Sequence, residues 1–487
     1  MTKTVLRAAF VALVCGGAVS QPVQAQISLI AKGTLTSSAA GQYRDLSGLN
    51  YTLENGAPAN LLGGLGSGIA YVGGDTFLAL PDRGPNAISF NSLIDDTVTY
   101  IPRVHTVRMN LEPNHKSGLP YTISPKLVDT TLLSSATPLV YGTGDAYNVG
   151  SGKPKENNFF RYYLSGRSDN FDADRSSGDP QDARFDPESI RLSNDGQTFF
   201  ISDEYGPYVY QFLRSNGTRI RTYTMPEEFY VAHPGTTTDQ EISMNTIGRI
   251  ANKGMEGLAI TPDGRTLVGI LQTATLQDTA EGGDAANLLR MAVVDVASGR
   301  VLHEYGYLLT TGSGVSDLVA LNDHELLVDE RDGKGLGDGS KAKVKQVFKI
   351  DLKNATDIRG MDGTSAAKVA VDKTLFLDIV KVLEDNGFTA AQIPSKIEGL
   401  AFGPDVKEKG KTIHTLWVAN DNDFLQDYEG TGTNPNLFFV FGFTDKDLDG
   451  SRYIPQGEDQ RGPFGGGSFG HGGPFGQGNP FGNGGWF

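Results

Sequence analysis

Cysteine is almost missing from this sequence of 487 residues. The only cysteine is Cys15, close to the N-terminus, so an intrachain disulfide framework is excluded. Histidines are few and scattered, and they signal neither a histidine-rich metal site nor a serine–histidine triad. Outside the Gly-rich C-terminal segment, G-x-S-x-G, H-E-x-x-H and P-loop motifs are also missing. The commonest signatures of serine hydrolases, zinc proteases and nucleotide-binding proteins are therefore not found.

Basic residues are outnumbered as well. The chain has 42 Lys and Arg residues against 57 Asp and Glu, which gives a formal net charge of −15. Nucleic-acid binding usually requires a basic face, and none is visible, so we expect no nucleic-acid partner. No run after the N-terminus is long and apolar enough to cross a bilayer, so we expect no transmembrane segment. An acidic balance suits a soluble exported protein, or one that collects cations.

The first 25 residues have the pattern of a secretory signal peptide. Lys3 and Arg7 form a basic start, residues 8–19 are apolar, and Val23-Gln24-Ala25 is a cleavage site of small residues. We expect residues 1–25 to be a signal peptide and the mature protein to begin at Gln26. The protein would then be exported, to the periplasm or the extracellular space.

One stretch of about 40 residues defines the fold. Between Asp186 and Met225, four short β-prone runs are separated by turn signals such as Asn194-Asp195-Gly196 and Ser215-Asn216-Gly217. This is the pattern of one β-propeller blade, and a blade needs neighbours to bury its two faces. Related units begin near Ser47, Ser67, Met255, Ser316 and Ile397.

We therefore predict an all-β protein with a single closed β-propeller of five or six blades over residues 26–450. Residues 27–35 form a strand that could close the ring by joining the last blade. Ser134–Arg184 reads as a long loop insertion, and Leu375–Asn386 has helical spacing. Residues 451–487 are assigned to a Gly/Pro/Phe-rich, low-complexity tail, in which we expect the part from about Gly457 on to be disordered.

Acidic residues open several of the repeated units. Aligned by the apolar residues that follow them, Ser67, Glu188, Glu256, Asp317 and Glu398 take one position. The first strand of a blade lines the central channel, so carboxylates would converge there and need a cation or raised pKa values. Ca²⁺, a hard cation with oxygen ligands, answers both needs. The alternative is that each acid caps its own blade.

A second set of polar residues lies where the second strands end. It comprises Asp82 and Arg83, Asp203 and Glu204, Glu330 and Arg331, and Asn420 to Asp423. By residue count, Asp82 corresponds to Asp203. The arginines suit bidentate capture of a phosphate or carboxylate, and the alternative is a salt bridge between blades. The predicted metal ligands are Asp82, Glu188, Glu204, Glu256, Asp317, Glu398 and Asp421.

Together these motifs resemble a known family. Asp82-Arg83-Gly84-Pro85-Asn86, Asp186-Pro187-Glu188-Ser189, Ser202 to Pro207, Met255-Glu256-Gly257-Leu258, Glu330 to Gly333 and Ile397-Glu398-Gly399-Leu400 look like the bacterial phytase-like family, also called "esterase-like activity of phytase". The resemblance covers about Asp45 to Phe443. It implies a calcium-associated propeller and phosphoester hydrolysis.

Three functional hypotheses follow. The first is an exported calcium-dependent phosphoesterase acting on a small phosphorylated substrate, with Glu188, Glu256 and Asp203 as catalytic residues and Arg83, Arg331 and Asn86 binding the substrate. The second is a lactonase-type propeller hydrolase, whose metal activates water against a carbonyl. The third is a non-catalytic binding propeller. The fold alone does not decide among them.

Overall fold

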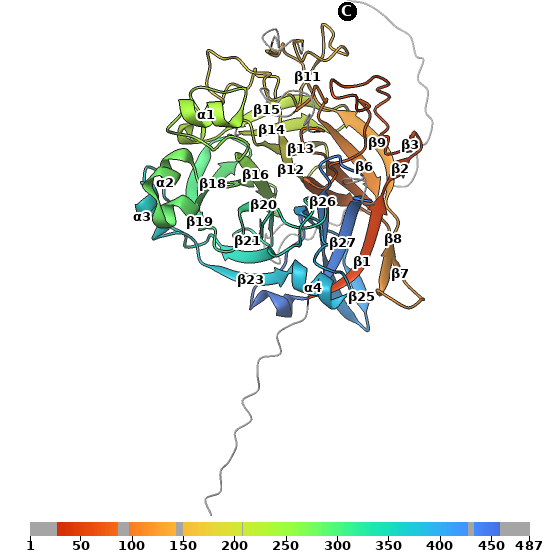
Figure 1. The fold of residues 1–487 in the computed structure, drawn as a ribbon. Coiled ribbons are helices and arrows are strands. Elements are labelled where there is room, and N and C mark those ends of the chain that lie inside the picture. The colour runs from red at the N-terminus through yellow and green to blue at the C-terminus, as the bar shows by residue number, and fades with distance from the viewer. Residues whose placement is uncertain (1–26, 86–96, 143–149, 207, 427–432, 458–487) are drawn as a thin grey trace, which may run out of the picture.

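The chain folds into a ring of five four-stranded blades (Figure 1). The computed structural model describes residues 27–85, 97–142, 150–206, 208–426 and 433–457. Each blade is an antiparallel meander whose first strand lies at the channel and whose fourth lies at the rim. The first strands contact one another in the cyclic order β4, β12, β16, β20, β24 and back to β4. This confirms the predicted propeller and sets the number of blades at five.

The blades follow the sequence order. The first contains β4 (Gly68–Gly73), β5 (Thr76–Leu80), β6 (Arg103–Arg108) and β9 (Lys126–Leu132). The second contains β12 (Pro187–Leu192), β13 (Thr198–Asp203), β14 (Tyr208–Leu213) and β15 (Thr218–Thr224), extended by β10 (Ser134–Ser135) and β11 (Tyr162–Tyr163). The third contains β16 (Met255–Ile260), β17 (Thr266–Leu271), β18 (Leu288–Asp295) and β19 (Val301–Leu308).

The fourth blade contains β20 (Gly314–Ala320), β21 (Glu325–Arg331), β22 (Lys345–Asp351) and β23 (Lys373–Asp378). The fifth contains β24 (Lys396–Phe402), β26 (Lys411–Asp421), β27 (Asn436–Phe443) and β1 (Ser28–Leu35), with β25 (Val406–Glu408) paired to β26. Short hairpins are formed by β2 (Ser37–Ser38) with β3 (Gly41–Gln42) and by β7 (Leu111–Pro113) with β8 (Tyr121–Ile123).

The N-terminal strand closes the ring, as predicted. β1 pairs antiparallel with β27, and Ala31 lies opposite Val440. The last blade is thus built from both ends of the propeller, which removes the open edge that a linear array of blades would leave. The predicted sixth unit near Ser47 is wrong as a blade, because the residues around it form only isolated bridges such as Arg44–Leu61 and Thr52–Pro58.

The hydrophobic core lies between the blades rather than in one centre. Five buried clusters each join two neighbouring blades around the ring. The cluster between the fifth and first blades contains Trp417 packed against Phe77, with ring centroids 4.5 Å apart and the ring planes tilted by 40°. Successive side chains of a strand point to opposite faces of its blade, and both faces are covered by neighbouring blades. The repeats therefore appear in the sequence as nearly continuous apolar runs.

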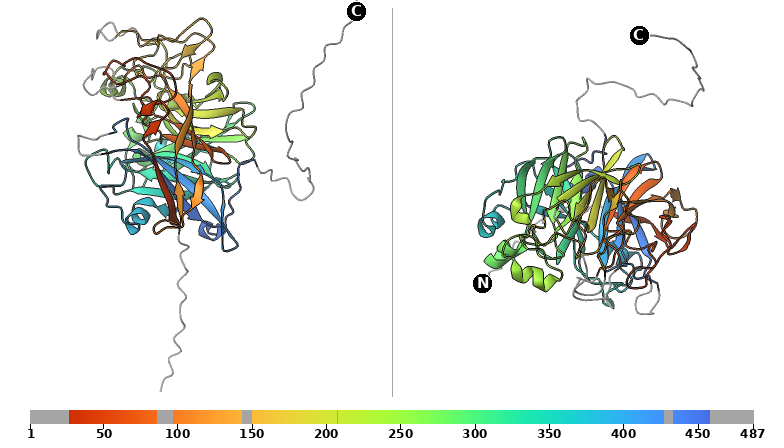
Figure 2. Two further views of the ribbon diagram at one scale, coloured as in Figure 1. Left: turned by 90° about the vertical axis from the view of Figure 1, so that its right-hand side faces the viewer. Right: turned by 90° about the horizontal axis from the view of Figure 1, so that it is seen from above.

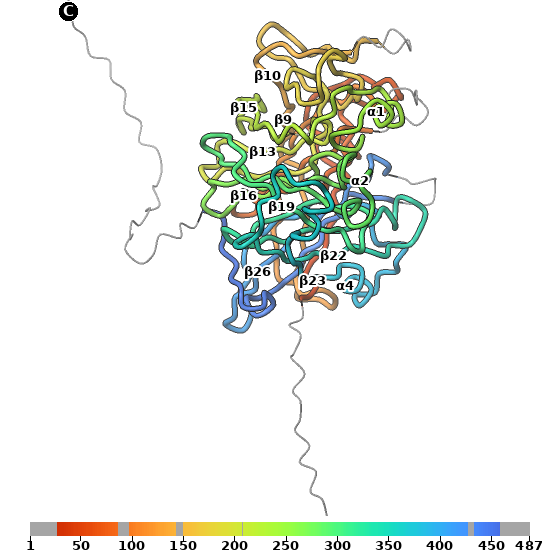
Figure 3. The backbone as a smooth tube through the Cα atoms, turned by 90° about the vertical axis from the view of Figure 1, so that its left-hand side faces the viewer, coloured from red at the N-terminus to blue at the C-terminus, as the bar shows by residue number. Residues whose placement is uncertain are grey.

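Helices lie in the connections between strands. They are α1 (Thr238–Met244), α2 (Leu276–Glu281), α3 (Gly363–Ala367) and α4 (Ile379–Asp385), with the 3₁₀ turns η3 (Glu227–Phe229), η4 (Gly283–Asn287) and η6 (Asp445–Leu448). Figure 3 shows α1, α2 and α4 on one side of the ring. The predicted helix starting at Leu375 is shorter than expected, because Lys373–Asp378 is the outer strand β23 and Asp378 caps α4.

Candidate functional site

Bulges shape the channel where the first strands begin. The pairing of first and second strands shifts register near the start of the first strand at Pro187/Ile190, Met255/Gly257, Val315/Leu318 and Ile397/Gly399, whereas in the first blade the shift lies at the other end of the strand, at Tyr71/Gly73. A bulge can re-aim a side chain away from the regular alternation of the strand. Glu188, Glu256 and Glu398 lie at these bulges, and all three are buried.

Asp317 does not share this position. Counted from the apolar residue after each bulge, Ser316 is the equivalent of Glu188, so the predicted alignment of Asp317 is wrong by one residue. Asp317 instead lies deeper in the channel, where both of its oxygens are 2.7 Å from Nη2 of Arg191. It also accepts hydrogen bonds from Ser189 Oγ and the Leu400 amide. This ion pair links three blades inside the ring.

The ends of the second strands supply another ring of side chains. The registers place Asp82, Glu204, Gln272, Arg331 and Asp421 at equivalent positions. The predicted match between Asp82 and Asp203 is therefore wrong, because the hairpin between the first two strands is one residue longer in the second blade: Ile190 pairs with Ile201, whereas Ile69 pairs with Ala79. Asp203 accepts hydrogen bonds from the amides of Asp186, Tyr205 and Gly206. It holds the turn after β13 and is not among the residues that line the cavity described next.

Side chains from both sets, those near the start of the first strands and those at the end of the second strands, surround one cavity of about 160 Å³. Eight carboxyl groups lie in or beside it, and we call them the carboxylate cluster: Asp82, Asp186, Glu188, Glu204, Glu256, Glu398, Asp421 and Asp423. The basic side chains that line it are Arg83, Lys253, Arg331 and Lys396. Acids outnumber bases at this end of the channel. Every blade except the fourth contributes at least one acid, and the fourth contributes Arg331.

Each of three basic groups is held by its own part of the cluster. Lys396 Nζ lies 2.9 Å from Asp421 Oδ2 and also contacts Asp423. Arg83 forms an ion pair with Asp186. Arg331 forms one with Glu398 and donates from Nε to Ser316 Oγ at 2.6 Å. These carboxylates already have a cationic partner from the protein itself.

The remaining group is Glu188, Glu204 and Glu256. One oxygen from each lies within 4.8 Å of the others. Glu204 is 3.8 Å from Arg83 and Glu256 is 3.7 Å from Arg331, both at the long end for an ion pair. Within the described residues, Glu204 Oε1 and Glu256 Oε2 are buried without a hydrogen-bond partner. Buried carboxylate oxygens left in this state are costly unless a proton or a cation is supplied.

The pKa values of the cluster reflect this crowding. Burial, and then repulsion from Glu256, raises the pKa of Glu204 to about 8. Burial, and then repulsion from Glu398, raises the pKa of Glu256 to about 8. The pKa of Glu188 is raised well above its usual value by burial and by Glu256. Burial raises the pKa of Asp82 and Asp421 to about 7. Without a cation, burial and crowding therefore favour the protonated form of these carboxyls.

This donor set fits a hard divalent cation. Carboxylate oxygens are preferred ligands of Ca²⁺, and orphaned oxygens at Glu204 and Glu256 are placed to provide them. The carboxylates predicted as ligands come together except Asp317. Asn86 lies outside the described residues. Sequence reasoning missed Lys253 and Lys396; Lys396 directly precedes the Ile397-Glu398 repeat, and the pairing of β24 with β26 places it opposite Asp421 in the same blade.

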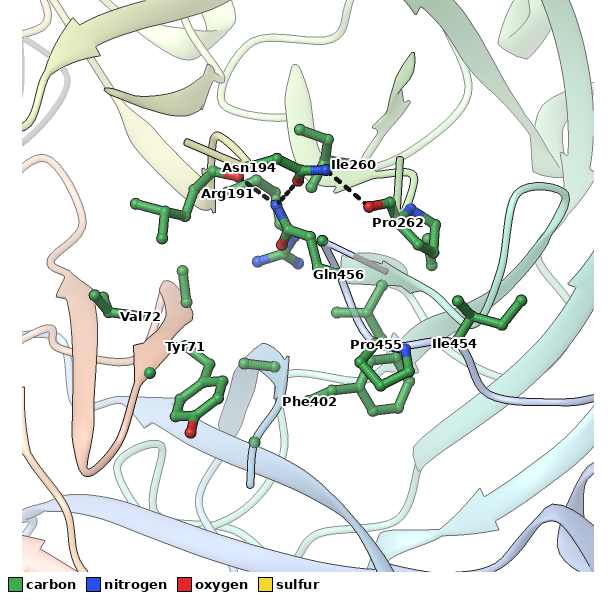
Figure 4. A pocket seen from close by; sticks show the side chains of 18 of the residues that line it. Tyr71, Val72, Arg191, Asn194, Ile260, Pro262, Phe402, Ile454, Pro455 and Gln456 are labelled. Carbon is green, nitrogen blue, oxygen red and sulfur yellow. Dashed lines mark hydrogen bonds between the residues drawn. The ribbon is translucent and has the colours of Figure 1, made fainter. Parts of the chain in front are cut away.

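A second, larger cavity lies at the opposite end of the channel, where the first strands end. It measures about 510 Å³, and its walls are mainly apolar side chains such as Ile260 and Phe402 (Figure 4). Residues 451–457 cross this end; Ile454 donates its amide to Leu321 and Gln456 Nε2 donates to Leu192. Asp317 and Arg191 lie between the two ends. The carboxylate cluster is therefore confined to one mouth.

Comparisons with known proteins agree with the sequence motifs. The model of the phytase-like family, described as esterase-like activity of phytase, matches residues 60–424. An "Uncharacterized secreted protein" of Arthroderma benhamiae is 25% identical, over 84% of this chain and 89% of that protein. The matched residues include the first and second strands of all five blades, which carry the carboxylate cluster.

Solved structures show weaker likenesses. Hydrazine synthase of Kuenenia stuttgartiensis aligns over 84% of this chain and 85% of its own, with 15% identity and a TM-score of 0.31. Hsv2 of Kluyveromyces lactis aligns over 62% and 58%, with 10% identity and a TM-score of 0.22. In the part of the chain that the structure describes, no helix is long and apolar enough to cross a membrane.

Proposed function

The chain belongs to the phytase-like family, and from that membership we propose an exported, calcium-dependent phosphoesterase that acts on a small phosphorylated substrate. The observation that carries the proposal is the group Glu188, Glu204 and Glu256, whose carboxylates converge beside two arginines. Export is supported by the N-terminal sequence and by the name of the secreted relative.

Glu188, Glu204 and Glu256 would hold the Ca²⁺, with Asp82, Glu398 and Asp421 around them. A bound Ca²⁺ would supply charge neutralisation at the phosphoryl oxygens and would lower the pKa of a water molecule. Most of the other carboxylates would stay balanced by Arg83, Arg331 and Lys396. The arrangement separates acids that bind a cation from acids that position a basic side chain.

The roles of the remaining groups follow from their contacts. Glu256 would hold the Ca²⁺ through one carboxylate oxygen, and its other oxygen would accept the proton of the attacking water. Arg331 uses Nε and Nη2 for Ser316 and Glu398, which orients Nη1 for a phosphoryl oxygen. Arg83 is held against Asp186 and would contact the phosphate from the opposite side.

The size of the site limits what enters it. Its cavity of about 160 Å³ is smaller than the roughly 300–1,000 Å³ typical of sites that enclose a whole ligand. We therefore expect the phosphoryl group to enter and the rest of the substrate to remain outside. A single-phosphate ester meets this condition as well as a polyphosphorylated one does.

The charge balance favours one competing substrate class. Acids outnumber bases at the mouth, and the nearby arginines are already paired with carboxylates. A neutral lactone would meet less repulsion there than a phosphate dianion. In that case the same cation would polarise a carbonyl, as in a lactonase-type hydrolase.

The test is a substrate panel measured on one protein preparation. Phosphomonoesters, phytate and lactones are each assayed with millimolar Ca²⁺ and again with excess chelator. We expect phosphate release that depends on Ca²⁺ and returns when Ca²⁺ is restored. Lactone hydrolysis alone would replace the proposed reaction, and activity on no substrate would favour a binding propeller.

A further inference from the structure

Two phenylalanines are exposed at the tip of a hairpin on the long loop before the second blade. Phe159 is 81% exposed and Phe160 is 80% exposed. The next most exposed large apolar side chain in the described residues is Ile247, at 54%. Singly exposed apolar residues are common on protein surfaces, but two adjacent phenylalanines left almost fully in water are unusual and indicate an interaction site.

The hairpin holds the two rings in a fixed position. Asn158 and Arg161 exchange two backbone hydrogen bonds, which makes Phe159 and Phe160 the two residues of a tight turn. Asn158 Oδ1 accepts the amide of Phe160 at 3.0 Å. The two rings contact each other edge to face, with centroids 5.0 Å apart. The rings are therefore displayed on an ordered turn.

The base of the hairpin is tied to the body of the protein. Asn157 Oδ1 accepts the amide of Tyr163, and Asn157 Nδ2 donates to the hydroxyl of Tyr141. Tyr163 packs in a buried cluster with Tyr100 and Phe424. Because Phe424 directly follows Asp423, the hairpin lies on the side of the ring that carries the carboxylate cluster. β11, at the foot of the hairpin, stands on the outer edge of the ring in Figure 1, and Figure 2 shows the loops of this region projecting beyond the blades.

Basic side chains flank the tip. Lys153 and Lys155 are exposed, and Arg161 follows the two phenylalanines directly. Lys155 lies over the ring of Tyr51, with Nζ 3.4 Å from the centroid. The acid among them, Glu156, accepts a hydrogen bond from the Tyr51 hydroxyl. This segment is locally basic on a protein whose formal net charge is −15.

From this geometry we infer that the Phe159–Phe160 hairpin inserts into the surface of a lipid membrane that contains anionic lipids. Phenylalanine rings are hydrocarbon only, which suits the boundary between headgroups and acyl chains. Lys153, Lys155 and Arg161 would meet the lipid phosphates, where each basic residue near an anionic surface adds attraction. The inference does not depend on the proposed hydrolysis, because none of these residues lines the channel cavity.

Two other partner classes fit less well. Stacking on a flat sugar ring requires an aromatic platform, but the planes of Phe159 and Phe160 are inclined at 88° to each other. A pocket in a partner protein would more often be filled by tyrosine, tryptophan or arginine, which add a hydrogen bond to the apolar contact. A convex apolar tip with cations around it matches a bilayer surface.

The first experiment is flotation of the purified full-length protein with phosphatidylcholine vesicles, with and without about one-third phosphatidylglycerol. We expect the protein to float with the anionic vesicles, more strongly at low salt. Replacing both phenylalanines by Ser should reduce binding at least about tenfold, since each ring contributes roughly that factor when it leaves water. The matched control replaces Ile247 and Leu375, two half-exposed apolar residues elsewhere on the surface, by Ser. Its binding should be unchanged.

The second experiment reads insertion directly. In Phe160→Trp, fluorescence should shift to the blue and be quenched by brominated lipids to a greater extent than in the wild type, whose tryptophans provide the background. Equal flotation of the wild type and the double Ser variant would overturn the inference, as would wild type that ignores anionic vesicles at low salt. Retention on insoluble cellulose that the Ser variant loses, without vesicle binding, would assign the hairpin to a polysaccharide instead.

Discussion

At the scale of single residues, the carboxylate cluster contains acids with different tasks. Asp421 and Asp423 hold Lys396, Asp186 holds Arg83, and Glu398 holds Arg331. Glu188, Glu204 and Glu256 converge, and Glu204 and Glu256 each have one buried oxygen without a hydrogen-bond partner among the described residues. Substitutions of single acids should therefore have distinguishable effects on catalysis, cation binding and folding.

Glu188→Gln and Glu256→Gln test the catalytic group. Each change keeps the side chain's shape and removes one charge. With Ca²⁺ present, turnover should fall by at least about 100-fold, the low end for loss of an acid–base group. In chelator at pH 8, the melting temperature should stay equal or rise, because one member of a repelling buried group is gone. Unchanged turnover in both variants would remove them from the site.

Asp317→Ala tests the corrected position of Asp317. Its carboxylate is buried against Arg191, and removing it leaves that guanidinium buried without its counter-charge. We expect a loss of about 3–5 kcal/mol in the free energy of unfolding, as for other broken buried ion pairs. Calcium affinity, measured by calorimetry below the melting transition, should not change. A large loss of calcium affinity with normal stability would return Asp317 to the metal site.

At the scale of elements, the residues that close the ring and the channel come from the two ends of the propeller. β1 completes the fifth blade. Residues 451–457, which composition assigns to the tail, pack against the opposite end of the channel, and the ring of Tyr453 lies 4.3 Å from that of Phe402. Backbone bonds join Ile454 to Leu321 and Gly457 to Pro262. These contacts tie the third, fourth and fifth blades together.

Two truncations separate this segment from the low-complexity tail. Ending the chain after Gly457 should leave the melting temperature unchanged, because the tail composition offers no packed core. Ending it after Gly450 should lower stability by about 3 kcal/mol or more, since a buried aromatic ring and its neighbours are lost. Differential scanning calorimetry measures both. Equal melting of the two truncated proteins would show that the segment adds nothing to stability.

The elements also show how far sequence reasoning reaches. Local patterns predicted the blades, the closing strand and the convergence of Glu188, Glu256 and Glu398, because turn residues and apolar pairs recur in every unit. Residue counting misplaced Asp203, because the first hairpin is one residue longer in the second blade than in the first. It misplaced Asp317 because this residue directly precedes the apolar Leu318, whereas Glu188 lies two residues before Ile190. The partners of Lys396 lie at the end of the neighbouring strand β26, about 25 residues later in the sequence, and only the strand register brings them opposite Lys396.

At the scale of the whole molecule, the crowded cluster couples stability to pH. In chelator-treated protein, Glu204 and Glu256 have pKa values of about 8, and Asp82, Glu398 and Asp421 of about 7. Burial is the main cause in each case. Unfolded, such groups titrate near about 4. Between these values the folded state binds more protons than the unfolded state, so the free energy of unfolding falls as pH rises.

We therefore expect the chelator-treated protein to melt at a lower temperature at pH 8 than at pH 5. Added Ca²⁺ should raise the melting temperature more at pH 8, where the cation replaces protons that the solution no longer supplies. Thermal melts across this range, with and without Ca²⁺, measure the effect. A Ca²⁺-induced gain that is the same at both pH values would contradict the coupling of protons to the cation.

The proposed calcium site in the carboxylate cluster is tested most directly by a calorimetric titration of Ca²⁺ into chelator-treated wild-type protein and into the Glu204→Gln variant. Glu204 belongs to the group with orphaned oxygens. The control is Asp195→Asn, because Asp195 is exposed and lies in the hairpin at the opposite end of the channel from the carboxylate cluster. We expect saturable binding to the wild type and the control, weakened at least about tenfold in Glu204→Gln by the loss of a charged ligand. Equal binding by all three proteins, or no binding by the wild type, would contradict a calcium site in the carboxylate cluster.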